Sequence, residues 1–358
     1  MIAISSSSIS QRRTAFTLHL QHIRFKYTDN LTPGIMPKAI LITGATGKQG
    51  GAVVDALLAA DPDGTKFTLL AVTRNASSPS AARLLSKAPH GNLQLVQGNL
   101  NDIPSLFESA TALLPEEGNN VWGVYSVQVS MGLGVSTAGE TVQGKALVDG
   151  AIANGVKHFV YSSVERGGDE KSWENETEIP HFQSKHRIEL HLRDMTAEGK
   201  PGAGMGWTVL RPVAFMDNLA PEFEAKVFVA ALKNYLGERD KALQWVAVAD
   251  IGVFAAAAFS EPEKWNHRAV GLAGDELTVE QLNDAFIKAT GHPAPTTYWL
   301  FGSALTRMVK EMGSMLEWFA SQGYGVNIAE LRKEHAGLLT MEEWLVKKSP
   351  FARTGTNK

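Results

Sequence analysis

The sequence predicts an α/β protein, with a doubly wound parallel sheet of the Rossmann type followed by a smaller, mostly helical lobe. Short apolar runs alternate with helical stretches of roughly 10–15 residues from Ala39 onward. The runs are apolar on both faces, as strands buried inside a parallel sheet are. A glycine-rich segment follows the first run directly, as it does in dinucleotide-binding folds.

Six runs are expected to form the strands of this sheet: 39–44, 67–74, 93–99, 121–128, 158–164 and 207–213. The helices between them are expected near 50–60, 79–88, 103–114, 137–154 and from His181 onward. Right-handed crossovers then place helices on both faces of the sheet.

The alternation weakens past about residue 214. Helices are expected near 221–236, 250–260, 278–290 and 303–321, with short strands in ALQWVAVA and RAVGLAG. Thr278 with Gln281, and Thr340 with Glu343, have the spacing of capping boxes, whereas Asp250 is expected to be a simple helix N-cap. We therefore predict an extension at 1–37, a Rossmann domain at 38–213 and a smaller lobe at 214–358, packed over the carboxyl ends of the strands.

Composition excludes several classes of function. The chain has 358 residues, 44% of them hydrophobic and 20% charged, and a net charge of −3, so no general basic field favours nucleic acid or anionic membrane. It contains no cysteine, which excludes disulfides and thiolate catalysis. The longest apolar run, 251–259, is too short to cross a bilayer and indicates a buried helix. The histidines lack metal-ligand spacing, so no metal site is expected.

The first 37 residues differ from the rest. They are rich in serine and contain four basic residues and one acidic residue. This composition is typical of a mitochondrial transit peptide, but also of a disordered extension or of a start codon assigned too early, with a folded role as a further alternative. We expect a cytoplasmic and also nuclear protein, or a mitochondrial one if 1–37 is a transit peptide.

The segment after the first strand has the spacing GxxGxxG, from Gly44 through Gly47 to Gly50. Glycines let the backbone turn sharply and let a helix N-terminus approach a pyrophosphate. A tight structural turn without a ligand is the alternative. The segment predicted to bind the cofactor comprises Gly44, Ala45, Thr46, Gly47, Lys48, Gln49 and Gly50.

Arg74 stands at the end of the second strand, where an acidic residue would bind a ribose 2′-hydroxyl. A guanidinium binds phosphate instead, so Arg74 favours NADP(H) over NAD(H), unless it is only a solvated surface charge. Asn75, Ser77 and Ser78 follow it. Topology also places Asn99 and Leu100 beside the adenine, and Val127 and Gln128 toward the ribose and nicotinamide.

The motifs ILITGATGKQGG, VTRN, VQGN, ETVQGKALVDGA, HFVYSS, PHFQSKHRIE, LRPVAFMDNL and TMEEWL occur in that order. Together they resemble the NmrA-like family, atypical members of the short-chain dehydrogenase/reductase superfamily, over residues 38 to about 348. The resemblance implies NADP(H) or NAD(P) binding by Gly44–Gln49, Arg74 and its followers, Asn99–Leu100 and Val127–Val129. It further implies cofactor contacts from Lys185 and from Ala214, Phe215, Met216 and Asp217. Family members include both oxidoreductases and dinucleotide sensors that regulate transcription factors.

The catalytic pattern of the superfamily is only partly present. Ser162 or Ser163 occupies the serine position, with Ser163 preferred, and Lys185 the lysine position, but His181 replaces the tyrosine four residues before it. Histidine can relay a proton, although the nearby lysine disfavours the imidazolium. The alternative is that His181 caps the helix or forms a local hydrogen bond, and Tyr161 is expected in the core.

The segment 297–325 is rich in aromatic residues and methionine, which favours a core, with a pocket wall or a protein-docking patch as alternatives. The residues concerned are Trp299, Phe301, Met308, Met312, Met315, Trp318 and Phe319. Two functions fit these observations. One is NADPH-dependent reduction of a carbonyl or conjugated alkene in a small hydrophobic metabolite. The other is a redox sensor without turnover that binds a regulatory protein.

Overall fold

The computed structural model describes residues 36–88, 90–116, 120–129, 136–237, 240–297 and 310–353. The fold described below is that of the unit Pro37–Lys358. Within the described residues, no helix combines the length and the apolar character needed to cross a membrane.

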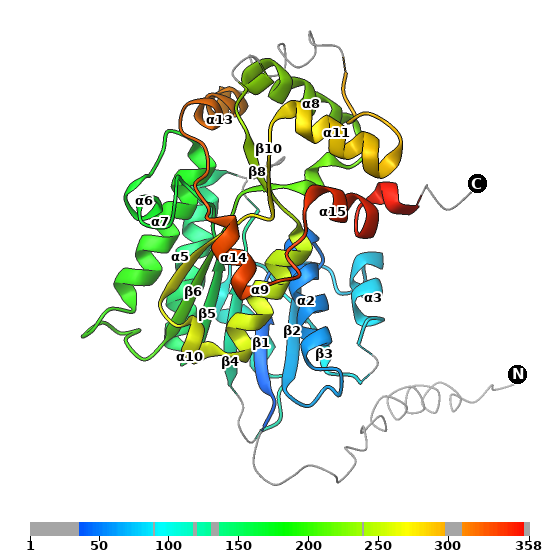
Figure 1. The fold of residues 1–358 in the computed structure, drawn as a ribbon. Helices are drawn as coiled ribbons and strands as arrows, with labels where there is room; N and C mark the ends of the chain where they lie inside the picture. Colours follow the sequence, from blue (N-terminus) through cyan, green and yellow to red (C-terminus); the bar gives the residue numbers. More distant parts are fainter. Residues whose placement is uncertain are drawn as a thin grey trace, which may run out of the picture. The chain divides into compact units, whose positions relative to one another are not determined.

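A seven-stranded parallel sheet forms the centre of the fold, in the order β3-β2-β1-β4-β5-β6-β9 (Figure 1). The strands are β1 Lys38–Ile42, β2 Phe67–Thr73, β3 Leu93–Gln97, β4 Val121–Ser126, β5 His158–Ser162, β6 Gly206–Pro212 and β9 Arg268–Leu272. The order reverses between β1 and β4, which confirms the predicted doubly wound Rossmann sheet.

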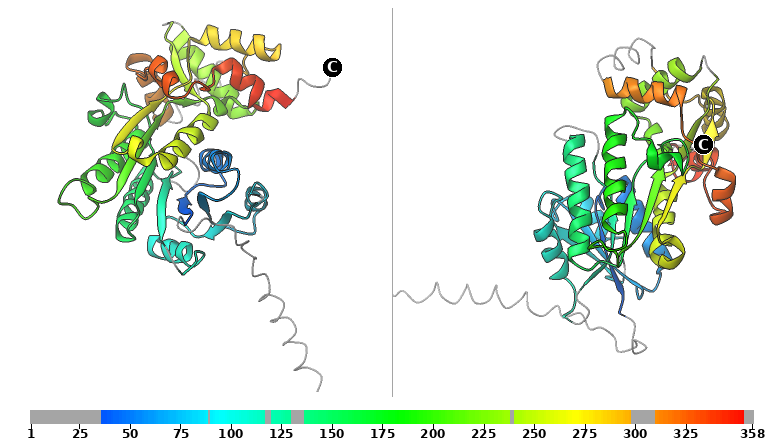
Figure 2. Two further views of the ribbon diagram at one scale, coloured as in Figure 1. Left: turned by 60° about the horizontal axis from the view of Figure 1, so that its bottom comes forward. Right: turned by 90° about the vertical axis from the view of Figure 1, so that its left-hand side faces the viewer.

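Helices cover both faces of the sheet. α4 (Ile103–Thr111), α5 (Thr137–Ala153) and α7 (Pro180–Met195) share one core cluster, and α2 (Lys48–Ala60), α3 (Pro79–Leu85) and α9 (Val248–Ser260) share the other. The side view shows α5 and α7 running next to each other (Figure 2). In β1, Ile40 and Ile42 belong to one cluster and Ala39 and Leu41 to the other, because successive side chains of a strand point to opposite faces.

The second lobe lies beyond the carboxyl ends of the central strands (Figure 1). It contains a three-stranded sheet of β7 (Ala214–Phe215), β8 (Leu243–Val246) and β10 (Asp275–Leu277). Its helices are α8 Phe223–Leu236, α11 Val279–Thr290, α13 Lys310–Ser321 and α15 Met341–Lys347. The helix α14 (Ile328–Glu334) instead packs on the Rossmann core through Leu331. Both predicted capping boxes are confirmed, at the starts of α11 and α15.

The predicted division at residue 213 does not follow the observed sheet. β9 pairs in parallel with β6, and α9 packs beside α2, so residues after 214 return to the Rossmann layers. A five-residue apolar run carries no signal for the sheet that it joins, which is why the sequence pattern placed β9 in the lobe.

The predicted N-cap role of Asp250 is wrong. Ala247 precedes α9, while the buried Asp250 carboxylate accepts a hydrogen bond from the Leu339 N–H at 3.0 Å.

Candidate functional site

Among the described residues, two of the cavities at the carboxyl edge of the parallel sheet contain most of the predicted site, and a smaller one shares Arg74 and Asn99 with the first of them. The first, of about 540 Å³, is lined by residues that follow β1, β2, β3 and β4. The second, of about 440 Å³, is lined by residues that follow β4, β5 and β6 and by the second lobe. The two cavities therefore lie on either side of the point where the strand order reverses, which is where Rossmann folds bind their ligands.

The glycine-rich turn leaves room that no other residue would leave. Gly44 has a φ of +60°, and a Cβ added at Gly50 would lie 2.4 Å from the Gly44 carbonyl oxygen. Gly47 precedes α2, and no side chain among the described residues caps the first N–H groups of that helix. These groups are free to bind an anion at the positive end of the helix. The turn thus fits the pyrophosphate of a dinucleotide.

The first cavity brings together part of the predicted cofactor set: Gly44, Thr46, Gly47, Arg74, Asn99, Leu100, Val127 and Val129. The Arg74 side chain is exposed, and within the described residues it makes no hydrogen bond or ion pair. Thr43, which the sequence analysis missed, also lines this cavity. Its hydroxyl donates to the Val127 carbonyl oxygen at 2.9 Å and accepts from the Val127 N–H at 2.8 Å, so it fixes the loop after β4 to the glycine turn.

Six predicted cofactor residues line neither cavity: Ala45, Gly50, Asn75, Ser77, Ser78 and Met216. Ala45 and Gly50 are buried under the glycine turn. The Ser78 hydroxyl oxygen accepts the Ala81 N–H at 3.2 Å as the N-cap of α3, and the Asn75 side chain accepts the Ser77 N–H at 2.9 Å. These side chains therefore shape the turn after Arg74.

The second cavity brings together all three predicted catalytic residues, Ser163, His181 and Lys185, each of them buried. His181 and Lys185 lie one turn apart on α7. The residue that caps α7 is Ile179, and the His181 ring packs edge-on against Phe182, with ring centroids 4.8 Å apart. The helix therefore presents His181 and Lys185 to the same cavity.

Ser162 and Ser163 have separate partners. The Ser162 hydroxyl donates to the Gln49 side-chain oxygen at 2.6 Å, which ties β5 to the start of α2. Ser163 lines the second cavity, where its hydroxyl oxygen lies 3.5 Å from the Arg166 guanidinium. Of the two candidates, Ser163 is the one that lines the cavity.

Glu140, another residue that the sequence analysis missed, contacts Lys185. The Lys185 ammonium lies 2.8 Å from one carboxylate oxygen of Glu140, and the Ser184 hydroxyl donates to the other. Glu140 is fully buried in the first turn of α5 and lines the first cavity, whereas Lys185 lines the second. This ion pair therefore forms part of the wall between the two cavities.

Six further predicted cofactor residues line the second cavity: Lys48, Gln49, Gln128, Ala214, Phe215 and Asp217. The Lys48 ammonium donates to the Asp217 carbonyl oxygen at 2.8 Å, and the Asp217 carboxylate accepts the Val248 N–H, also at 2.8 Å, at the start of α9. Met216 lies between these residues in the chain, but its side chain is fully buried in the core of the lobe.

Aromatic side chains form the remaining wall of the second cavity: Phe182, Phe215, Phe228, Phe319 and Tyr324. Met315 lines it as well, while Trp318 is buried in the lobe core. Of the apolar segment predicted at 297–325, Trp299, Phe301, Met308 and the side chain of Met312 lie outside the described residues. The described part of that segment thus supplies both core and cavity wall.

A model of the NmrA-like family matches residues 36–345. The chain belongs to the NmrA-like family. It is 28% identical over 273 residues to the NmrA-like family domain-containing oxidoreductase lnaB of Aspergillus flavus, covering 72% of this chain and 74% of the relative. It is 25% identical over 262 residues to the Dictyostelium discoideum NmrA-like protein DDB_G0286605, covering 71% and 78%.

Solved structures share the fold of this NmrA-like chain. NmrA, a negative transcriptional regulator, superposes with a TM-score of 0.62 at 19% identity, over 89% of this chain and 98% of its own. NmrA has been solved in complex with NAD and with NADP. Citrobacter sp. triphenylmethane reductase complexed with NADP(H) superposes with a TM-score of 0.59 at 19% identity, over 86% and 98%.

A buried ionic cluster holds the segment after β5 in this NmrA-like protein. The Glu189 carboxylate lies 2.8 Å from the guanidinium groups of both Arg166 and Arg211, and all three side chains are fully buried. Burial alone would raise the pKa of the Glu189 carboxyl, but the two guanidinium charges and their hydrogen bonds outweigh it and lower that pKa. Since Arg166 also donates to the Val164 carbonyl oxygen at 2.7 Å, the cluster fixes the segment that carries Ser163.

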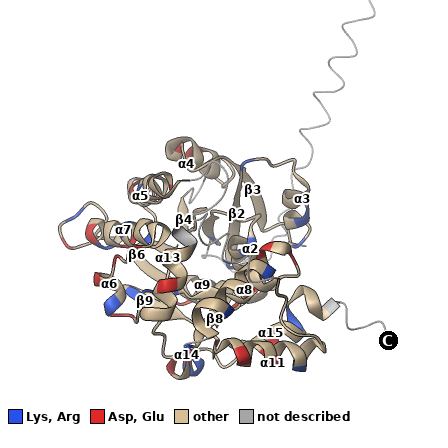
Figure 3. Ribbon diagram, turned by 90° about the horizontal axis from the view of Figure 1, so that it is seen from above, with Lys and Arg blue, Asp and Glu red and all other residues tan. Residues whose placement is uncertain are grey.

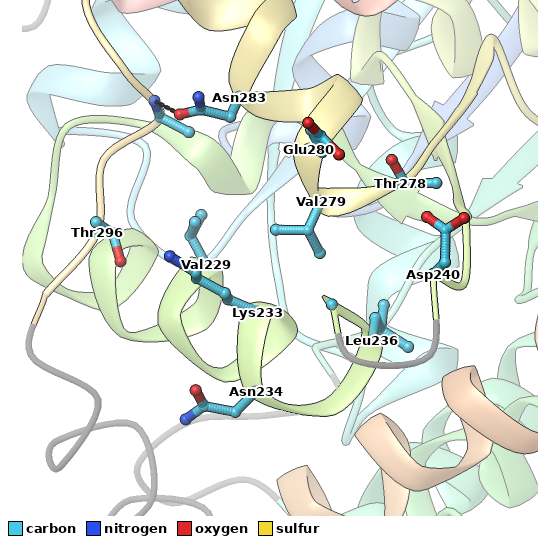
Figure 4. Close-up of a pocket in the computed structure, with 12 residues that line it drawn as sticks. Val229, Lys233, Asn234, Leu236, Asp240, Thr278, Val279, Glu280, Asn283 and Thr296 are labelled. Carbon is cyan, nitrogen blue, oxygen red and sulfur yellow. Dashed lines mark hydrogen bonds between the residues drawn. The ribbon is translucent and has the colours of Figure 1, made fainter.

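Another cavity, of about 570 Å³, lies between α8 and α11 in the second lobe (Figure 4). Lys233 and Glu280 line it, together with Asn283, whose side chain accepts the Ala294 N–H at 3.2 Å. The described residues that line this cavity all belong to the lobe, and none of them comes from the glycine turn or from the ends of the parallel strands.

Charged residues of both signs are interspersed along the ribbon when the molecule is seen from above (Figure 3).

Proposed function

We propose that this NmrA-like protein is an NADPH-dependent oxidoreductase that reduces a carbonyl or conjugated alkene of a small hydrophobic metabolite. One observation carries the proposal: Ser163, His181 and Lys185 line one aromatic-walled cavity beside the cavity of the glycine turn. Curated relatives from several fungi are named oxidoreductases, which supports it.

The residues of the first cavity would hold the cofactor. The turn Gly44–Gly50 would bind the pyrophosphate, and Arg74 the 2′-phosphate of NADP(H). Because Glu140 and Lys185 join the two cavities, the ribose next to the nicotinamide would lie beside this pair. When bound, NADPH supplies the hydride and leaves as NADP⁺.

The chain's own side chains would handle orientation and the proton. The Ser163 hydroxyl would position the substrate oxygen, and His181, Lys185 or a water held by them would donate the proton to the reduced product. The surrounding aromatic wall would exclude water and favour an apolar substrate.

The alternative is a sensor without turnover, whose surface changes with NADP⁺ or NADPH occupancy and so alters binding to a regulatory protein. The replacement of the catalytic tyrosine by His181 favours it. A sensor needs a differential affinity of the two ligand states for two conformations of the protein.

Absorbance of NADPH distinguishes these functions. Purified protein is mixed with NADPH and a panel of aromatic ketones, enones and quinones, and loss of nicotinamide absorbance is followed. We expect oxidation with at least one substrate, and a loss of about 100-fold or more in kcat for Lys185→Met. Tight NADPH binding without oxidation across the panel would support the sensor instead.

We further propose a cytoplasmic location for the protein, unless residues 1–37 act as a transit peptide. Fluorescent fusions of the full chain and of residues 36–358 test this. Mitochondrial fluorescence of the full chain alone would show that the first segment directs import.

A further inference from the structure

Tyr324, a residue of the second lobe, lines the same cavity as Ser163, His181 and Lys185. It follows α13 in the short sequence Gly323–Gly325 and is more than 130 positions away from Lys185 along the chain. No spacing rule links it to the catalytic pattern, so only the fold brings it to this site.

The position of Tyr324 is fixed on both sides. Its ring packs against the rings of Trp318 and Phe319, with centroids 5.3 Å away in each case. The N–H of the next residue, Gly325, donates to the fully buried Glu165 carboxylate at 3.0 Å. Glu165 belongs to the segment after β5 that begins with Ser163, so one segment holds both Ser163 and the loop of Tyr324.

The Tyr324 hydroxyl is not used by the protein. Among the residues that the structure describes, it has no hydrogen-bond partner. Burial raises the pKa of Tyr324 well above its usual value, and the Glu165 charge raises it further, so the hydroxyl keeps its proton at neutral pH. The Tyr324 side chain is partly buried and lines a largely apolar cavity, so its hydroxyl is available to a ligand that accepts a hydrogen bond.

We propose that the Tyr324 hydroxyl donates a hydrogen bond to a carbonyl oxygen of the substrate, and so provides from the second lobe the phenol that position 181 lacks. The inference rests on the proposed function and narrows its substrate class to apolar, aromatic ketones or enones. In the reaction, hydride adds to carbon and NADPH is oxidised to NADP⁺. The proton on the product comes from His181, Lys185 or water, while Tyr324 keeps its own.

The test compares Tyr324→Phe with Tyr161→Phe. The Tyr161 hydroxyl likewise has no hydrogen-bond partner among the described residues, but it is fully buried in the core and lines neither cavity, so its removal is the control. Binding to the NADP⁺ complex is measured for aromatic ketones and enones, each paired with its deoxygenated hydrocarbon analogue, for example chalcone and 1,3-diphenylpropene.

We expect Tyr324→Phe to weaken binding of the carbonyl compounds by about tenfold and to leave the hydrocarbons unchanged. Tyr161→Phe should change neither. The proposal would be overturned if Tyr324→Phe weakened binding of both members of a pair equally, or if it weakened neither. It would also be overturned if the wild-type protein did not bind the carbonyl compound more tightly than its hydrocarbon analogue.

Turnover separates this inference from the proposed function. If the wild-type protein is active, Tyr324→Phe should lower kcat/KM for the carbonyl substrates by about 10- to 100-fold. If the wild-type protein oxidises no NADPH but Tyr324→Phe abolishes the preference for carbonyl ligands, the reductase proposal fails while the binding role of Tyr324 stands.

Discussion

The ammonium group of Lys185 lies 2.8 Å from the Glu140 carboxylate, and this pair is almost wholly buried between α5 and α7. Lys185 is therefore not an isolated cation beside His181. From the sequence alone Lys185 was expected as an unpaired charge, whereas in the structure Glu140 supplies its counter-charge. Glu140 also determines where the Lys185 ammonium lies, which makes it a positioning residue for the candidate site.

A double-mutant cycle on Glu140→Gln and Lys185→Met measures this pair. Each single change leaves a buried partner without its counter-charge, and we expect each to lower the free energy of unfolding by about 3 kcal/mol. The double variant should lose less than the sum of the singles, with a coupling of about 1 kcal/mol or more in urea unfolding. The exposed pair Lys288–Glu342, also 2.8 Å apart, should show less than about 1 kcal/mol. Additive losses at Glu140 and Lys185 would contradict the assignment.

Glu189→Gln should strongly destabilise the fold. The change leaves the buried Arg166 and Arg211 guanidinium groups without a counter-charge, which costs about 3–5 kcal/mol of the free energy of unfolding. Urea unfolding, or soluble yield if the variant does not fold, gives the measurement. Glu176→Gln is the control, because the Glu176–Arg187 pair is about half exposed and should contribute less than about 1 kcal/mol. A similar, small effect of both changes would show that the cluster is not a structural support.

Arg74→Ala should weaken NADP⁺ binding by about 10- to 100-fold and NAD⁺ binding little, because only NADP⁺ carries the phosphate that the guanidinium would bind. Isothermal titration with both nucleotides measures the ratio of the two affinities. Arg83→Ala, on the exposed side of α3, keeps the net charge change the same and should leave both affinities unchanged. Equal losses for both nucleotides would refute the role of Arg74 in NADP preference.

The parts of the structure that could be predicted from sequence are those that depend on local pattern. Apolar runs, a glycine turn and capping boxes each act over a few residues, and so the first six strands and the starts of α11 and α15 lie close to where they were expected. The joining of β9 to β6 depends on pairing between segments about 60 residues apart, which no local pattern encodes.

The candidate site divides in the same way. Ser163, His181 and Lys185 could be predicted because motif spacing fixes them relative to one strand and one helix. Glu140 was missed because an acidic residue in the first turn of a helix is common on any surface, and only the packing of α5 on α7 gives it a buried partner. Tyr324 was missed because its place in the cavity depends on how the second lobe packs over the sheet.

Two buried groups, His158 and Asp250, make the stability of the fold depend on pH in opposite directions. Burial, helped by the Lys38 charge, lowers the pKa of His158 to about 4, so the unfolded chain binds its proton first as pH falls below about 6.5. This costs stability progressively down to pH 4, by about 3 kcal/mol in total. Burial raises the pKa of Asp250 to about 6, so the folded chain binds that proton more tightly than the unfolded one. The stability from Asp250 is fully present below about pH 4 and is lost as pH rises through 6, again by about 3 kcal/mol.

Between pH 4 and 6 these two contributions oppose each other, and the single variants should separate them. His158→Gln leaves the Asp250 effect alone, so its free energy of unfolding should fall relative to wild type as pH rises. Asp250→Asn leaves the His158 effect alone, so its free energy of unfolding should rise relative to wild type over the same range. Each slope should differ from that of the wild type by up to about 1.4 kcal/mol per pH unit, measured by urea unfolding from pH 4.5 to 6.5. Parallel curves for all three proteins would show that neither group titrates as its burial requires.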